Sequence, residues 1–184
     1  YLCSLTKKSY ICSMKKLITI LFLFLSVISY GQSELETKIF KYFNEYRIEH
    51  GLNPVEFNDK VFLSTTHHNN YLNDNGYPYG YTLSNAHREK ELVYVNDRIK
   101  KYGITTLLSS GECIAYVFRA IKESDDSVLK NTIKLWDGSP SHKKVMLLAD
   151  IDIGAISVLP LVNSNGCDYF LVTLNVVTLM NHLP

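Results

Sequence analysis

The stretch LWDGSPSHKKVMLL, residues 135–148, combines signals that end one helix and begin another. It holds the only Trp of the chain, and a Gly and a Ser-Pro pair follow that Trp closely. Gly is common just past a helix end, and Ser-Pro suits the cap and first position of a new helix. We therefore expect a helix to end at Trp136 and a short one to begin after Ser139. A plain helical hairpin does not need His142, which makes this residue a candidate for function.

Helical patterns occupy most of the chain before this stretch, and strand patterns follow it. Apolar periodicity and end signals, among them a capping box at Ser33 and Glu36, predict helices over residues 34–50, 59–73, 96–102 and 125–136. GECIAYVF, residues 111–118, reads as a short buried strand. The β-rich runs 151–159 and 169–177 flank an Asn-Gly turn and predict a hairpin. Helices first and an antiparallel pair last favour an α+β domain with helices packed on a small sheet.

The N-terminal region has the layout of a secretory signal. Residues 1–13 contain no Met, and Met14 opens two Lys and an apolar run over 17–28. That run is too short for a membrane span, which needs about 20 apolar residues. We predict an upstream non-native segment at 1–13, a signal peptide at 14–31 and a single exported domain at 32–184.

Charge and length restrict the class of partner. The 184-residue chain has a formal charge of +1, which becomes −3 without the four Lys that precede residue 32. A slightly acidic domain with no basic block gives no reason to expect nucleic acid. About 150 residues suffice for one core, and we expect a monomer without a stable membrane span.

Two Cys, Cys113 and Cys167, lie in the predicted exported domain. An even pair in an exported chain predicts a disulfide. The alternative is two buried thiols. Because no Cys lies at the predicted cleavage site, we do not expect a lipid anchor.

Three residues stand out as chemically active candidates: His87, Glu112 and His142. Glu112 leads into the predicted buried strand, where a carboxylate is costly unless it is paired. His68 lies on the apolar face of its helix and is expected to be a hydrogen-bonded core residue, whereas His67 is expected to face solvent. The short motifs of zinc proteases, serine hydrolases and phosphate-binding loops are absent from the sequence.

Six blocks of sequence follow one another between residues 39 and 177. They are FNEYRIEHGLNPVEFND (43–59), SNAH (84–87), NDRIKKYG (96–103), SGECIAY (110–116), LWDGSPSHKKVML (135–147) and IDIGAISV (151–158). In order and spacing they resemble the CAP superfamily, the SCP-like extracellular domain of cysteine-rich secretory, antigen 5 and pathogenesis-related proteins, in its short bacterial form.

The resemblance implies a secreted α-β-α sandwich with a small, mainly antiparallel sheet between helices. It also implies a cleft that contains His87, Glu112 and His142. Two imidazoles and a carboxylate are donors for zinc or another divalent cation; a metal-free polar network is the other interpretation. Cys113 replaces the family's Asn, and Ser139 falls near the place of a further family Glu, so a four-residue set cannot be transferred.

These observations favour an extracellular binding or interaction module over an enzyme. Its ligand would be a small molecule, lipid, glycan or protein. The alternative is a secreted metal-dependent hydrolase or peptidase that uses His87, Glu112 and His142. We also expect Tyr77, Tyr79 and Tyr81 to line the cleft mouth, because Tyr offers a rigid apolar face with a polar tip.

Overall fold

A four-stranded sheet in the order β1-β3-β4-β2 forms the centre of the fold. Its strands are β1 (Glu56–Phe57), β2 (Leu107–Arg119), β3 (Ile153–Leu161) and β4 (Asp168–Leu179). β4 pairs antiparallel with β2 and β3, which confirms the predicted pairing of the last two strands. β1 pairs parallel with β3 and was not predicted, because two residues are too few for a visible alternation.

This computed structural model describes residues 31–78, 85–120, 122–161 and 168–180. The predicted upstream segment and almost all of the predicted signal peptide lie outside these ranges. So does the predicted hairpin turn. A compact unit runs from Gln32 to Pro184. The described residues contain no helix with the length and hydrophobicity of a transmembrane span.

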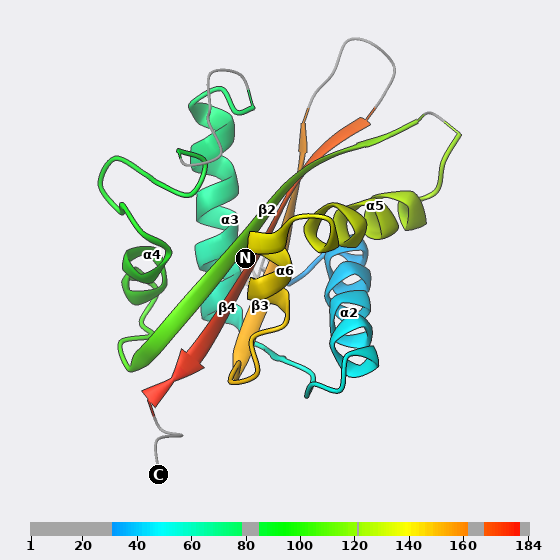
Figure 1. Ribbon diagram of the computed structural model, residues 1–184. Coiled ribbons are helices and arrows are strands. Elements are labelled where there is room, and N and C mark those ends of the chain that lie inside the picture. The colour runs from blue at the N-terminus through cyan, green and yellow to red at the C-terminus, as the bar shows by residue number, and fades with distance from the viewer. Residues whose placement is uncertain (1–30, 79–84, 121, 162–167, 181–184) are drawn as a thin grey trace, which may run out of the picture. The chain divides into compact units, whose positions relative to one another are not determined.

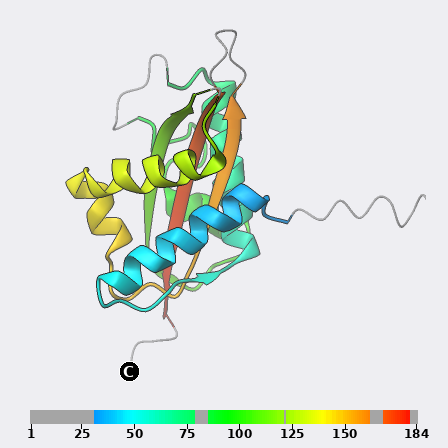
Figure 2. The same ribbon diagram turned by 90° about the vertical axis from the view of Figure 1, so that its right-hand side faces the viewer.

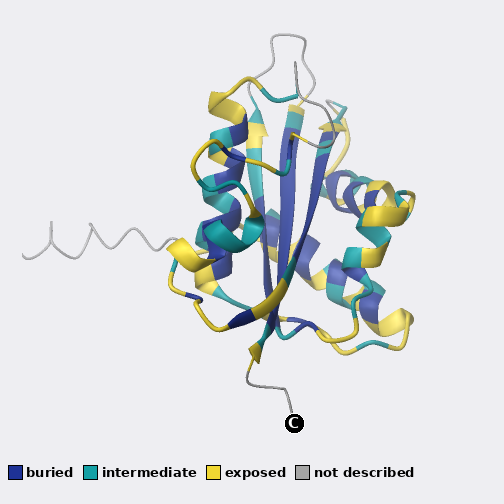
Figure 3. Cartoon of the chain, turned by 60° about the vertical axis from the view of Figure 1, so that its left-hand side comes forward, coloured by how far each residue is buried: buried dark blue, intermediate teal, exposed yellow. Residues whose placement is uncertain are grey.

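Helices cover both faces of the sheet, as Figure 1 shows, and the predicted α-β-α sandwich is confirmed. One face carries α2 (Glu34–Glu49), α5 (Asp125–Asp137) and α6 (Pro140–Met146), and α2 and α5 lie across the strands in Figure 2. The other face carries α3 (Asp59–Asp74) and α4 (Val95–Lys101). Figure 3 shows that the buried residues of the strands lie between these two layers.

Local sequence signals explain where the helices begin. Ser33 and Glu36 form the predicted capping box of α2: the Glu36 amide donates to Ser33 Oγ (3.2 Å), and the Ser33 amide donates to the Glu36 carboxylate (2.6 Å). The other Glu36 oxygen accepts from the Val158 amide at 2.8 Å, which ties α2 to β3. Pro140 occupies the first turn of α6 after extended Ser139, as predicted.

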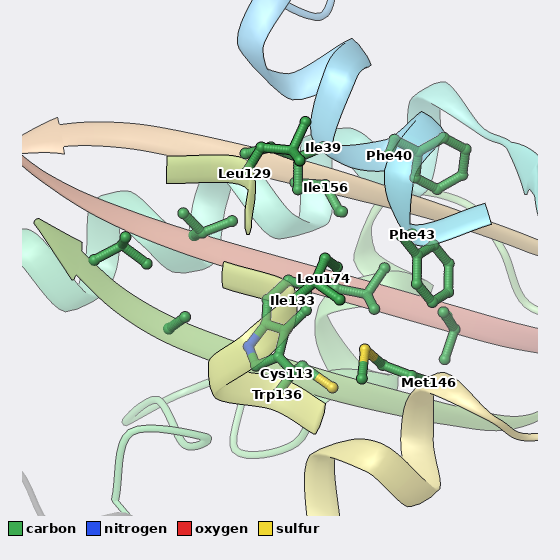
Figure 4. Close-up of a cluster of buried hydrophobic side chains, with 14 of the residues drawn as sticks. Ile39, Phe40, Phe43, Cys113, Leu129, Ile133, Trp136, Met146, Ile156 and Leu174 are labelled. Carbon is green, nitrogen blue, oxygen red and sulfur yellow. The ribbon is translucent and has the colours of Figure 1, made fainter. Parts of the chain in front are cut away.

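The larger core cluster lies between the sheet and the α2, α5 and α6 layer. Trp136 is fully buried there, close to Cys113, Ile133 and Met146 in Figure 4. The only Trp of the chain, just before the Gly-Ser-Pro corner, is thus a core residue. Trp136 therefore fixes the end of α5, and with it the place where α6 begins.

Gly111 allows α6 to lie directly against β2. A Cβ atom at this position would be 2.7 Å from Val145 Cγ1 of α6 and 3.2 Å from Val176 Cγ2 of β4. Carbon atoms in contact are normally separated by about 3.5–4 Å. The missing side chain is what lets α6, which carries His142, approach the strand that carries Glu112.

Cys113 is a buried, free thiol, and Cys167 lies outside the described residues. In the β2–β4 register Cys113 is opposite Leu174, whereas Asp168, the neighbour of Cys167 in sequence, is opposite Arg119. Six positions along a strand correspond to roughly 20 Å, and a disulfide needs Cα atoms within about 7 Å. The register therefore gives no support to the predicted Cys113–Cys167 bridge.

The contact between Gly111 and Val145 gives a stability prediction. Gly111→Ala should lower the free energy of unfolding by about 1–3 kcal/mol, because the new methyl group overpacks the α6–β2 contact. Urea denaturation measures the change. In the Val145→Ala background the same substitution should cost much less, and an equal cost in both backgrounds would contradict the proposed contact.

Candidate functional site

Glu112 lies on the α3 and α4 side of β2, and its side chain is only 4% exposed. Both carboxylate oxygens are engaged. Oε1 accepts from His87 Nδ1 at 3.0 Å, and Oε2 accepts from Arg98 Nη2 and from Asn175 Nδ2, the latter at 2.9 Å. The prediction that this carboxylate must be paired is confirmed, since three side chains from three segments donate to it.

A second buried carboxylate, Glu89, extends this arrangement. Its Oε1 lies 2.8 Å from His68 Nδ1, its Oε2 lies 3.1 Å from His67 Nε2, and Arg98 Nε is 3.5 Å away. His68 Nε2 lies 2.8 Å from the Ala86 carbonyl and 3.6 Å from Glu112 Oε1. We call Glu89, Arg98, His68 and Glu112 the buried ion network.

His68 is hydrogen-bonded through both of its ring nitrogens. Each of its nitrogens faces an acceptor, the Glu89 carboxylate or the Ala86 carbonyl. An imidazole can donate from both nitrogens only when it is protonated on both. In that form the network holds two carboxylates and two cations, so that neither carboxylate is buried without a counter-charge.

The network keeps its carboxylates ionised despite their burial. Burial raises the pKa of Glu112, but the charges of His68 and Arg98 and the hydrogen bond from His87 outweigh it and hold this pKa at about 2. Burial likewise raises the pKa of Glu89, and the hydrogen bond from His68 together with the charge of Arg98 lowers it below its usual value. Both groups can therefore only accept hydrogen bonds at neutral pH.

Two imidazoles, His87 and His142, lie partly exposed beside Glu112. Their ring centroids are 6.1 Å apart and the rings are tilted by 58°. Because ionised Glu112 only accepts, His87 carries its proton on Nδ1, which leaves Nε2 for an external group. Burial and the charge of His87 lower the pKa of His142, although Glu112 acts in the opposite direction.

The structure thus brings His87 against both Glu112 and His142, but the predicted three-ligand metal set is not formed. Among the described residues, no group of three or more His, Cys, Asp or Glu side chains could hold a metal ion. The physical reason lies in Glu112, since Arg98, Asn175 and His87 already occupy its oxygens. Glu112 orients His87 and is not available as a ligand.

Of the three Tyr expected at the cleft mouth, Tyr77 is described, whereas Tyr79 and Tyr81 lie outside the described residues. Tyr77 is half-buried and packs edge-on against Tyr116, with ring centroids 6.2 Å apart. It also borders the apolar cluster around Leu72 and Ala86. The role of the three Tyr at a cleft mouth stays a prediction.

The sequence predicted the role of His68 as a core residue but did not predict most of its hydrogen-bond partners. The expectation that His68 is a hydrogen-bonded core residue is confirmed. The expectation that His67 faces solvent is wrong in part, because its Nε2 contacts Glu89. Arg98 and Glu89 were not predicted as site residues, because each lies in a polar stretch of sequence. The one available signal was that a buried Glu112 requires a partner, which indicated a cation without identifying it.

Comparison with known proteins identifies the fold. No family model and no curated protein matches the chain. Among solved structures, an extracellular protein containing an SCP domain from Bacillus anthracis matches 78% of this chain with a TM-score of 0.56 and 19% identity. An outer surface protein from Borrelia burgdorferi matches 81% with a TM-score of 0.56 and 18% identity. A cysteine-rich secretory protein from Staphylococcus aureus matches 81% with a TM-score of 0.51 and 14% identity.

These likenesses establish that the chain has the SCP, or CAP, fold, in agreement with the resemblance found in the sequence. The match covers 40% of the Bacillus chain and 40% of the Staphylococcus chain, but 98% of the Borrelia chain. Two of the three similar proteins are therefore much longer than the matching part.

The low pKa of Glu112 predicts how stability depends on pH. A carboxyl group whose pKa is lower in the folded than in the unfolded state stabilises the fold above its unfolded pKa of 4.5, and this stability is lost as the pH falls toward about 2. The contribution of Glu112 is about 3 kcal/mol. Urea denaturation of wild type between pH 6 and pH 2 should therefore show a steep loss, and Glu112→Gln should show a shallower one.

At pH 7, Glu112→Gln should be less stable than wild type by about 3–5 kcal/mol, because Arg98 loses one of its two buried counter-charges. Glu91→Gln, which removes an exposed carboxylate nearby, is the matched control and should change stability by less than about 0.5 kcal/mol. Equal effects of the two substitutions would contradict the account of the network.

Proposed function

We propose that this chain is exported and acts outside the cell as a binding module, which takes its ligand at the His87–His142 pair through a divalent cation such as zinc. Export rests on the predicted signal peptide at 14–31. It is supported by the descriptions of the similar structures as extracellular, outer surface or secretory proteins. Residues 32–184 would be the exported domain.

The observation that carries the proposal is the contact between Glu112 and His87 Nδ1 at 3.0 Å. Metal-binding imidazoles usually donate their second nitrogen to a carboxylate, which fixes the ring and makes the ligating nitrogen more basic. Glu112 serves His87 in this way, and the buried ion network holds Glu112 in turn. Glu112, which the sequence predicted as a third ligand, would therefore orient a ligand and would not bind the cation itself.

The two imidazoles suit one shared cation. Zinc lies about 2.1 Å from a His nitrogen, so rings that share an ion have centroids roughly 5–6 Å apart. The centroids of His87 and His142 are 6.1 Å apart. Ligating His must be neutral, and the lowered pKa of His142 favours that form. Two protein ligands leave positions open for donor groups of a bound partner.

The same contacts argue against the hydrolase alternative. A general base for neutral pH works best with a pKa near 7, whereas that of Glu112 is about 2. Cys113 is buried, and burial raises the pKa of its thiol well above the usual value, so it is a poor nucleophile. The Tyr77–Tyr81 loop would instead supply apolar contacts to a bound partner.

Calorimetry with zinc tests the proposal. The unmodified protein should bind one zinc ion, and His142→Ala should abolish that binding without unfolding the domain, since Trp136 and the Gly-Ser-Pro corner remain. Affinity should fall as the pH is lowered below about 6.5, because protons compete for the imidazoles.

His50→Ala is the matched control, because His50 is an exposed imidazole whose Nδ1 lies 2.7 Å from the Tyr46 carbonyl at the end of α2. It should leave zinc affinity unchanged. If His142→Ala and His50→Ala bind zinc equally well, the His87–His142 pair is not the metal site. If the zinc-loaded protein cleaves peptides and His142→Ala does not, the hydrolase alternative is favoured instead.

A further inference from the structure

A separate pocket of about 440 Å³ opens beside α3 and α4, and its lining contains neither His87 nor His142. His67 and Tyr71 of α3 form one side, and Lys101 of α4 forms another. The chain segment from Glu89 to Leu92 closes it. The volume lies within the range of about 300–1,000 Å³ that is typical of small-molecule sites.

The walls of this pocket are held in place without a ligand. The Tyr71 hydroxyl accepts from the Lys90 amide at 3.1 Å. The Tyr71 ring is also nearly parallel to the buried His68 ring, with centroids 6.4 Å apart and an angle of 8°. His67 is fixed through Nε2 on Glu89. A preformed site of this kind loses little entropy when a ligand binds.

Charge and polarity define what the pocket can bind. Lys90 and Lys101 are exposed, and neither has a carboxylate partner among the ion pairs of the described residues. Glu91 is the one exposed carboxylate of the lining, and Glu89 is already engaged by the buried ion network. The lining therefore carries two ammonium groups and one exposed carboxylate.

The other lining residues provide an apolar contact surface and a hydrogen-bond acceptor. The Tyr71 ring and Leu92 offer apolar contact. Since ionised Glu89 only accepts, His67 donates from Nε2, and its Nδ1 is an acceptor whenever the ring carries a single proton. A ligand with an anionic group, an apolar body and a hydrogen-bond donor would satisfy all these surfaces at once.

We propose that this pocket is a second ligand site, which binds a small organic acid. The carboxylate of the ligand lies between Lys90 and Lys101, its apolar body packs on Tyr71 and Leu92, and a hydroxyl or amine donates to His67. The site is independent of the proposed cation at His87 and His142.

The probes are phenylacetate and 4-hydroxyphenylacetate, with phenylacetamide as the neutral analogue and inorganic phosphate as a plain anion. Binding is followed by the chemical shifts of backbone amides during NMR titration of the full chain. Both acids should shift Tyr71, Lys90 and Lys101, and 4-hydroxyphenylacetate should bind more tightly. Phenylacetamide and phosphate should bind at least about tenfold more weakly, since each lacks the charge or the apolar body.

Lys101→Gln should weaken phenylacetate binding about tenfold, because a charge-assisted hydrogen bond is lost. Lys100→Gln, with the same change of charge on the same helix but outside the lining, should bind like wild type, and so should His142→Ala. The proposal fails if neither acid shifts the pocket residues, if phosphate binds as well as the acids, or if Lys100→Gln and Lys101→Gln weaken binding equally. Because His142→Ala retains this pocket, a failure of the pocket proposal can be told apart from a failure of the cation-site proposal.

Discussion

The burial of the Glu112 carboxylate is the constraint on which the rest of the site depends. A charged group that is only 4% exposed requires donors and counter-charges around it. Arg98 from α4, Asn175 from β4 and His87 from the segment before α4 supply the hydrogen bonds, and His68 from α3 supplies further positive charge. One carboxylate thus fixes how α3 and α4 lie on the sheet and which way the His87 ring points.

The burial of Glu112 also bears on whether the site is better suited to binding or to catalysis. The interactions that keep Glu112 ionised also occupy both of its carboxylate oxygens, so that Glu112 is placed to orient the His87 ring. The exposed face of the site consists of His87 and His142, with α6 held against β2 because Gly111 has no side chain. Such an arrangement is suited to holding a ligand, and the SCP fold provides the rigid sheet that supports it.

The sequence predicted those features that depend on local signals. The capping box at Ser33, the Gly-Ser-Pro corner and the pairing of the last two strands follow from neighbouring residues, and all are present. Arg98 and Glu89 were missed because their burial depends on contacts between separate elements of the fold, which local sequence patterns do not reveal. The predicted Cys113–Cys167 bridge rested on an even count, which says nothing about strand register, and the register sets Cys113 far from the start of β4.

Ionised Glu112 fixes His87 as the tautomer protonated on Nδ1, with Nε2 left for a ligand. The 15N chemical shifts of the His87 ring in its neutral form measure this directly, because the protonated and unprotonated nitrogens differ widely. The account predicts a proton on Nδ1 in the wild type and a mixture of tautomers in Glu112→Gln. A proton on Nε2 of His87 in the wild type would contradict it.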